Sequence, residues 1–322
     1  DPWTASEMGY PNSLNALLDL LRYTSKNYVQ PSKLKVLKKA GKALSFLGKR
    51  GLIPPLLSNL PNMLKHLKEF KGECFSYISL FDYLSTLLFL QMQKEYQPQF
   101  SLIFLNSLAH LQHHHWRSEN ILSSKRFLYG LKYLDKAFAK IFEQQGPNDT
   151  IIVTNALSQK NTNQEEPWIL YRPKDQGEFL KAIGLEFVKI EPHMTHDAHI
   201  FFHSKEECQK AFDVLTKAHV NGELLFHVET YKEDPLKLFY KLIFTRKIAP
   251  DTKMEANHKK FSFFSLFTAI VERTGKHIQT GLLLSNRDIF PKQIKNHEIF
   301  DCIDQFFDPK KERVSLRNET KE

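Results

Sequence analysis

The sequence is poor in cysteine and has no long apolar run. Its three cysteines are odd in number and far apart in a chain of 322 residues, at Cys74, Cys208 and Cys302. This spacing excludes a disulfide framework and a CxxC metal knuckle, and reduced thiols favour a cytosolic or otherwise reducing location. No apolar run approaches the roughly 20 residues of a transmembrane helix, and no signal-peptide pattern opens the chain. Because the first residue is Asp, we expect a processed or excised product with residues missing upstream.

Glycine and proline are also scarce, at 12 and 15 residues, while 42% of the chain is hydrophobic. This is the composition of a folded globular protein, long enough for one large or two ordinary domains. The sequence contains no GxxxxGK[ST] phosphate loop, no GxGxxG after a strand, no HExxH and no GxSxG. The common nucleotide-binding, zinc-protease and serine-hydrolase motifs are therefore excluded.

Positive charge is concentrated in one segment. Between Lys33 and Lys71 there are ten Lys and Arg residues against Glu69 alone, and the rest of the chain is balanced. Because the excess of positive charge is confined to this one segment, it does not indicate a nucleic-acid-binding face. The segment from Lys33 to Arg50 predicts a basic amphipathic helix, which either touches an anionic membrane surface or presents a solvated lysine face. Its apolar stripe, expected to face the core, consists of Leu34, Leu37, Ala40, Leu44 and Leu47.

The apolar periodicity divides the chain into segments. Residues 1–98 predict a helical N-terminal segment, because their apolar residues recur at three-four spacing. From residue 99 to 310 we expect an α/β core, with residues 185–250 as an inserted β-α-β-β unit and 311–322 as a charged tail. The segment "NHEIFDCIDQFF" predicts a final helix.

The start of the α/β core predicts a parallel crossover. "FSLIFLN" (100–106) and "DTIIVTNAL" (149–157) have the length and composition of buried strands, and residues 123–146 between them predict a long helix. A strand, a long helix and a second strand are typical of a parallel α/β sheet covered by helices. In such sheets, sites form at the carboxyl ends of the strands.

Polar residues follow these predicted strands and make the candidate site. Asn106 and His110 follow the first strand, and His277 precedes an apolar run near the end of the chain. The second strand is followed by four candidate ligand-binding residues, Thr154, Asn155, Ser158 and Gln159. Ser158 either binds a ligand or caps a helix.

The order of these motifs resembles the alkaline phosphatase superfamily, in particular its type I phosphodiesterase and nucleotide pyrophosphatase branch. The segments that carry the resemblance are Asn106-Ser-Leu-Ala-His110, Thr154-Asn155-Ala156-Leu157, and Gly275-Lys-His277 ahead of Gly281. They look like the family's Asp-x-x-Gly-His, Ser-Asp-His-Gly and Gly-x-His motifs. The resemblance implies an alkaline phosphatase-like core and two metal ions, usually zinc, that activate a Thr or Ser nucleophile.

The chain departs from the family pattern at most ligand positions. Asn106 and Asn155 stand where the family has ligating Asp residues, Ala156 replaces a ligating His, and Ala109 replaces a glycine. We find no strand with a nucleophile ahead of residue 99, so the nucleophile lies upstream or is absent. We therefore do not expect a conventional two-zinc hydrolase. His110 and His277 stay as candidate ligands of zinc or another divalent metal, if a metal is bound at all.

Two functional hypotheses follow. In the first, the protein is a divergent phosphoesterase-like hydrolase that acts on a phosphate mono- or diester with an altered metal site. In the second, it is an inactive relative that binds a polar ligand or a protein partner in the inherited cleft.

The other histidines have two interpretations each. His113, His114 and His115 are consecutive and point about 100° apart on a helix, so that they cannot all reach one ion. We expect a surface or capping role for them, although His110 and His114 share a face. The segment "EPHMTHDAHIFFH" offers a substitute metal set or ordinary sheet-surface residues, at His193, His196 and His199.

Overall fold

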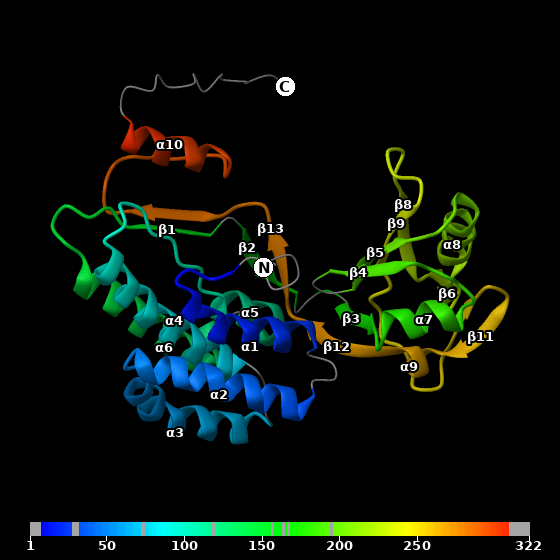
Figure 1. The fold of residues 1–322 in the computed structure, drawn as a ribbon, viewed down its shortest axis with the longest axis horizontal. Coiled ribbons are helices and arrows are strands. Elements are labelled where there is room, and N and C mark those ends of the chain that lie inside the picture. The colour runs from blue at the N-terminus through cyan, green and yellow to red at the C-terminus, as the bar shows by residue number, and fades with distance from the viewer. Residues whose placement is uncertain are drawn as a thin grey trace.

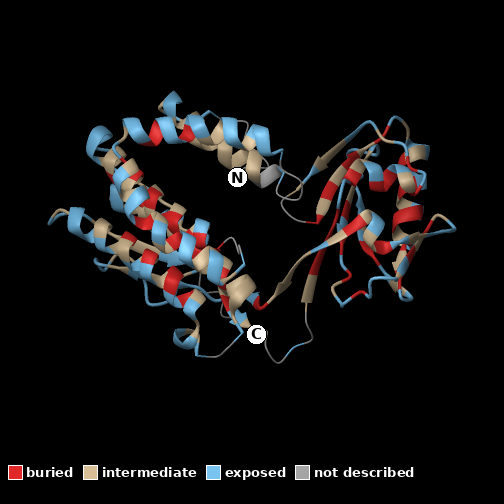
Figure 2. Ribbon diagram, turned by 90° about the horizontal axis from the view of Figure 1, so that it is seen from below, coloured by how far each residue is buried: buried red, intermediate tan, exposed pale blue. Residues whose placement is uncertain are grey.

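The computed structural model describes residues 8–27, 32–71, 75–117, 120–155, 157–162, 165, 168–193 and 196–308. The predicted charged tail, Cys74 and Ala156 lie outside the described residues. Within them the chain has a mixed α/β fold with small antiparallel sheets. The helices between residues 15 and 144 gather on one side, and the two four-stranded sheets, with further helices around them, lie on the other (Figure 1). Buried residues form separate groups among the helices and in the sheets (Figure 2).

The first part of the chain is helical, as the apolar periodicity predicts. After a short 3-10 turn at Asn12–Leu14, the helices are α1 (Asn15–Lys26), α2 (Lys33–Lys49), α3 (Ile53–Glu69), α4 (Phe75–Tyr96), α5 (Ser107–His115) and, after a second turn at Ile121–Ser123, α6 (Lys125–Gln144). The break between α2 and α3 is built from residues suited to it. Gly51 has φ +66°, where L side chains are strained, and prolines occupy the first turn of α3, where no backbone N–H is needed.

The core between these helices is aromatic and aliphatic. Phe75, Leu111, Phe127 and Tyr133 are each at most 1% exposed and pack in one cluster that joins α4, α5 and α6. Burying side chains of this size stabilises the fold by about 1.5–3 kcal/mol each. This cluster fixes α5, the helix that carries the histidines.

None of the described helices is long and apolar enough to span a membrane.

The prediction for the stripe of α2 is partly wrong. Leu47 is buried, but Leu34, Leu37 and Leu44 are 77%, 71% and 48% exposed. The face that α2 buries is instead centred on Phe46, Leu47 and Ala43. Helix α2 therefore presents leucines beside its lysines to the outside.

The predicted strand at residues 100–106 is also wrong. Those residues have no regular secondary structure and pair with no strand of the described chain, and Leu102 and Phe104 are each 79% exposed. Every strand pair described is antiparallel, so the parallel crossover is wrong as well. An apolar run of this length becomes a strand only if a neighbouring strand accepts its hydrogen bonds.

Three two-stranded ladders lead away from the helices. β1 (Ile152–Asn155) pairs with β14 (Leu282–Ser285), β2 (Ser158–Asn161) with β13 (Gly275–Ile278), and β3 (Trp168–Pro173) with β12 (Phe267–Arg273). Segments that are more than 90 residues apart in sequence are thereby side by side. The last described helix, α10 (Glu298–Phe307), lies where the sequence predicts it.

The remaining strands form two sheets with their own core. One has the order β4-β5-β9-β8, from Lys189–Pro192, Asp197–Phe201, Lys237–Leu242 and Phe226–Thr230. The other has the order β11-β10-β6-β7, from Lys259–Ser262, Lys253–Ala256, His219–Val220 and Glu223–Leu224. With α7 (Gln176–Ala182), α8 (Lys205–Lys217) and the short α9 (Phe263–Leu266), they enclose a core that extends from Tyr171 to Phe267.

Candidate functional site

Helix α5 is held at its start by a buried carboxylate. The Asp82 side chain of α4 is 4% exposed, and its Oδ2 accepts a hydrogen bond of 2.7 Å from the backbone N–H of Ser107. Burial raises the pKa of Asp82, while the backbone N–H groups of Ser107 and Asn106 act in the opposite direction. Asn106 itself is exposed and makes no capping hydrogen bond. Our sequence reasoning missed Asp82, although a lone carboxylate inside an apolar helix is a signal for such a role.

The other end of α5 is fastened to β13. The N–H of Thr274 donates to the carbonyl of His113 at 2.7 Å, and the N–H of Trp116 donates to the Thr274 hydroxyl at 2.7 Å. Gly275 allows this close approach, because a Cβ there would lie 2.3 Å from the Gln112 carbonyl oxygen. The glycine of the Gly-x-His motif is therefore required where helix and strand meet.

Strand β2 brings Gln159 to the same place. In the β2–β13 ladder His277 is opposite Gln159, and Ile278 is opposite Ser158. Gln159 is 7% exposed, and its Nε2 donates to the Ala109 carbonyl of α5 at 3.2 Å. The structure thus joins α5, β2 and β13, and we call this place the α5–β2–β13 junction.

The histidine rings at the junction form two contacts. The rings of His113 and His277 have centroids 4.7 Å apart, and those of His110 and His114 are 4.4 Å apart. The candidate ligand His277 therefore packs on His113 rather than on His110. From the sequence we expected a surface or capping role for His113. Its position three residues after His110, on the same helix face, was the feature that could have indicated a place at the junction.

Burial keeps three of these imidazoles neutral. Desolvation lowers the pKa of His110 to about 4, with His115 and His113 acting in the same direction. Desolvation and then Arg273 lower the pKa of His113 to about 4, and desolvation followed by His110 lowers that of His114 to about 3. Neutral imidazoles accept hydrogen bonds and ligate metals, but they provide no positive charge for an anion.

The buried atoms at the junction that have no hydrogen-bond partner among the described residues include His114 Nδ1 and Gln159 Oε1. Buried polar atoms are normally paired with protein, water or a ligand. These atoms mark the junction as a place where a polar group from outside the chain is expected to bind.

The junction does not supply a complete metal site. No group of three or more His, Cys, Asp or Glu side chains in the described ranges has the arrangement to hold an ion. The His110–His114 and His113–His277 pairs each offer two imidazoles and no carboxylate, whereas zinc sites use three or four protein ligands. The residues present therefore do not fit the family's metal pair.

The other predicted ligand-binding residues lie in ladders. Thr154 and Asn155 are exposed at the end of β1, opposite Leu283 and Leu282. The Asn155 Nδ2 contacts the Ser158 hydroxyl at 3.4 Å. Ser158 begins strand β2, so the interpretation that it caps a helix is wrong. The contact between Asn155 and Ser158 links the end of β1 to the start of β2.

Comparison with protein-family models, curated proteins and solved structures found no match to this chain. The resemblance to the alkaline phosphatase superfamily therefore stays a prediction.

The histidine-rich segment around β5 gives a second group of polar side chains. His193 and His199 are hydrogen-bonded to each other at 2.9 Å, and His196 is buried at 8% exposure. On β5, Ala198 and Ile200 face the core, and Asp197, His199 and Phe201 face outward, as the alternation predicts. A substitute metal set of three histidines is not formed in the part of the chain that the structure describes.

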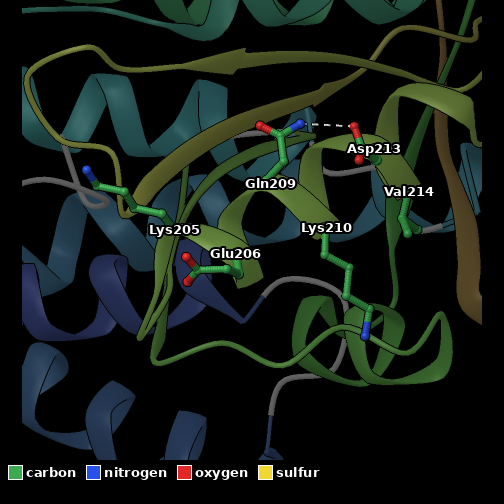
Figure 3. Close-up of a pocket in the computed structure, with 6 residues that line it drawn as sticks. All are labelled: Lys205, Glu206, Gln209, Lys210, Asp213 and Val214. Carbon is green, nitrogen blue, oxygen red and sulfur yellow. Dashed lines mark hydrogen bonds between the residues drawn. The ribbon is translucent and has the colours of Figure 1, made fainter.

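A shallow groove on α8 is separate from both histidine groups. It has a volume of about 610 Å³ and is lined by Lys205, Glu206, Gln209, Lys210, Asp213 and Val214. Figure 3 shows that these side chains come from one helix, and the Gln209 Nε2 is hydrogen-bonded to Asp213 Oδ1 at 3.0 Å. Groups on one helix surface do not converge on a ligand, so the groove is no candidate active site.

Proposed function

We propose that the protein is a divergent phosphoesterase-like member of the alkaline phosphatase superfamily that binds a phosphate mono- or diester at the α5–β2–β13 junction. The observation that carries the proposal is the meeting of Ala109, Gln159 and His277. Ala109 and His277 belong to two of the segments that carry the family resemblance, and Gln159 follows the third segment by two residues. Nothing in the sequence alone requires these segments to be neighbours.

The chemistry of the junction supports a polar ligand that brings its own hydrogen-bond donors. Gln159 Oε1 is a buried acceptor, and one nitrogen of a neutral imidazole such as His114 can accept from a ribose or glycerol hydroxyl or from a protonated phosphate. Arg273, which acts on the pKa of His113, is a positive charge near the junction that could attract a phosphate oxygen. Binding a phosphate ester would satisfy these groups together.

Hydrolysis would require two further components. We assign no nucleophile for phosphate-ester hydrolysis at the junction, and no reaction step through a metal ion, because a two-imidazole pair lacks the further ligands that zinc needs. Asn106 and Asn155 cannot provide a carboxylate. The proposal therefore places substrate binding at the junction and assigns no reacting group there.

A combined binding and turnover experiment tests the proposal. The purified chain is loaded with Zn²⁺ or Mn²⁺, its metal content is measured, and hydrolysis of 4-nitrophenyl phosphate and bis(4-nitrophenyl) phosphate is followed. We expect calorimetric binding of the phosphate ester that His277→Ala weakens at least tenfold. His227→Ala is the matched control, because its side chain is 54% exposed on β8 and lies outside the junction. Ester binding that is absent, or unchanged in His277→Ala, would reject the proposal.

The second candidate is an inactive relative that binds a polar ligand or a protein partner in the same place. It is favoured by the lack of a three-ligand group in the described ranges and by the use of Asn155 in the turn beside Ser158. The same experiment separates the two. Ester binding without bound metal and without turnover supports the inactive relative, and metal-dependent turnover supports the enzyme.

A membrane contact through Lys33 to Arg50 is a separate proposal. It is supported by the exposed Leu34, Leu37 and Leu44 of α2 beside a lysine-rich face, an arrangement typical of helices that lie on anionic lipid. We expect flotation with anionic liposomes but not with neutral ones. Binding that Lys38→Glu and Lys42→Glu leave unchanged would reject this contact.

A further inference from the structure

The outward face of the β4-β5-β9-β8 sheet carries a continuous chain of hydrogen bonds. Asp197 Oδ2 contacts His193 Nδ1 at 3.1 Å, His193 Nε2 contacts His199 Nδ1 at 2.9 Å, and His199 Nε2 contacts the Tyr231 hydroxyl at 2.8 Å. The four side chains come from β5, from the segment before it and from the end of β8. They therefore form a row across the sheet, far in sequence from the α5–β2–β13 junction.

The direction of the protons in this chain follows from the chemistry of its ends. A carboxylate only accepts, so His193 Nδ1 carries a proton and, in a neutral ring, His193 Nε2 accepts. His199 Nδ1 must then donate, which leaves His199 Nε2 as the acceptor for the Tyr231 O–H. The Tyr231 hydroxyl therefore donates to His199 in the same way that a catalytic serine hydroxyl donates to its histidine. Asp197 is at the other end of the hydrogen-bond chain.

The surroundings of Tyr231 supply positive charge. The Lys237 ammonium lies 4.8 Å from the centroid of the Tyr231 ring and 5.7 Å from that of Phe201. The Tyr231 side chain is only partly buried, so that a small molecule can reach the hydroxyl. Phe239 packs on both histidines, at 5.9 Å from His193 and 5.5 Å from His199, and holds their rings in place.

We propose that Tyr231 is the nucleophile of a second reactive site, activated by the His199–His193–Asp197 relay towards small activated acyl esters. The Tyr231 oxygen bonds to the ester carbonyl carbon while its proton moves to His199 Nε2. The bond from that carbon to the leaving alkoxide or phenoxide then breaks, which yields an acyl-tyrosine and an imidazolium that later releases its proton to water. The Lys237 ammonium, 4.8 Å from the centroid of the Tyr231 ring, adds positive charge near the reacting phenol. His193 and Asp197 are positioning residues that hold His199 in the accepting tautomer.

The pKa shifts of Tyr231 and His199 determine which result the proposal predicts. Burial, followed by Glu229, raises the pKa of Tyr231, so preformed phenolate is scarcer than in an exposed tyrosine. Burial, Lys237 and His193 lower the pKa of His199, although Glu191 and Asp197 oppose this, so the ring is neutral at pH 7 and has a nitrogen that can accept a proton. Fast reaction of Tyr231 would therefore come from the relay and not from its own acidity.

The experiment uses the intact chain and 4-nitrophenyl acetate, with acetylation of each tyrosine followed by peptide mass spectrometry between pH 7 and 9. Tyr77 is the internal control, because it is 51% exposed. We expect Tyr231 to be acetylated at least tenfold faster than Tyr77 at pH 7, at a rate nearly independent of pH. The rate for an ordinary phenol rises about tenfold per pH unit below its pKa of about 10.

Variants separate the relay from simple exposure. His199→Ala is expected to slow acetylation of Tyr231 at least tenfold, with partial recovery in added imidazole, and His227→Ala on the same sheet is expected to change nothing. Asp197→Asn should lower the rate without abolishing it. A Tyr231 rate that equals that of Tyr77, or rises tenfold per pH unit, would overturn the proposal, and so would an unchanged rate in folded His199→Ala. The pH comparison needs no variant, so that misfolding cannot hide the answer.

Discussion

Acid should destabilise this protein through the buried histidines of α5. We consider a change from pH 7 to pH 5 and its effect on the protonation of His110. In the unfolded chain its pKa is about 6.5, and in the folded chain burial lowers it to about 4. As the pH falls below 6.5 the unfolded chain takes up a proton that the folded chain does not, so the free energy of unfolding decreases. The loss is complete below pH 4.

The size of the effect follows from the two pKa values. At pH 5 the unfolded imidazole is almost fully protonated and the folded one almost fully neutral, so His110 alone costs about 2 kcal/mol relative to pH 7. His113, with a similar pKa, acts in the same direction, and the two are not additive because each lowers the affinity of its neighbours for protons. About 2 kcal/mol is a large part of the stability of an ordinary domain.

Urea unfolding at pH 7 and pH 5 measures this loss. Between pH 7 and pH 5 the free energy of unfolding of the wild-type chain should fall by at least 2 kcal/mol. The fall should be about 2 kcal/mol smaller in His110→Gln, because glutamine cannot be protonated, and this difference does not depend on the stability of the variant at pH 7. His227→Gln, with an exposed side chain, is the control and should keep the wild-type difference. Equal stability of the wild-type chain at both pH values, or an unchanged difference in His110→Gln, would refute burial of this ring.

Two further predictions concern the attachment of α5. Gly275→Ala should destabilise the chain by about 1–3 kcal/mol, because its Cβ would meet the Gln112 carbonyl at 2.3 Å. Gly41→Ala in α2, with nothing within 4 Å, should instead stabilise by about 1 kcal/mol, and thermal unfolding compares them. Asp82→Ala should cost about 1–3 kcal/mol by leaving the buried Ser107 N–H without its acceptor. Asp82→Asn keeps an acceptor oxygen and should cost less in the same measurement, whereas equal losses would show that the hydrogen bond is unimportant.

The helices could be predicted from sequence because their apolar residues repeat at a local spacing. The segments of α4 and α6 have this repeat, and both helices lie where it predicts them. Residues 100–106 show where local pattern fails. An apolar run is compatible with a strand, but the strand exists only if a partner lies beside it, and the partner is set by the rest of the fold.

The candidate site was predicted in part. The place after a predicted strand identified Gln159, and the Gly-x-His motif identified His277; the two residues lie opposite each other at the junction. His113 and Asp82 were missed, because their roles depend on the neighbours that tertiary packing brings, Gly275 and Ser107. In α2, the sequence identified the apolar stripe that includes Leu34 and Leu37, but it did not identify which face of the helix packs against the core.

The most direct test of the account is calorimetric titration of the purified chain with a phosphate ester, in parallel with His277→Ala and His227→Ala. If the α5–β2–β13 junction binds phosphate esters, the wild-type chain and His227→Ala bind equally and His277→Ala binds at least tenfold more weakly. Equal binding by all three chains, or none by the wild-type chain, would contradict the account.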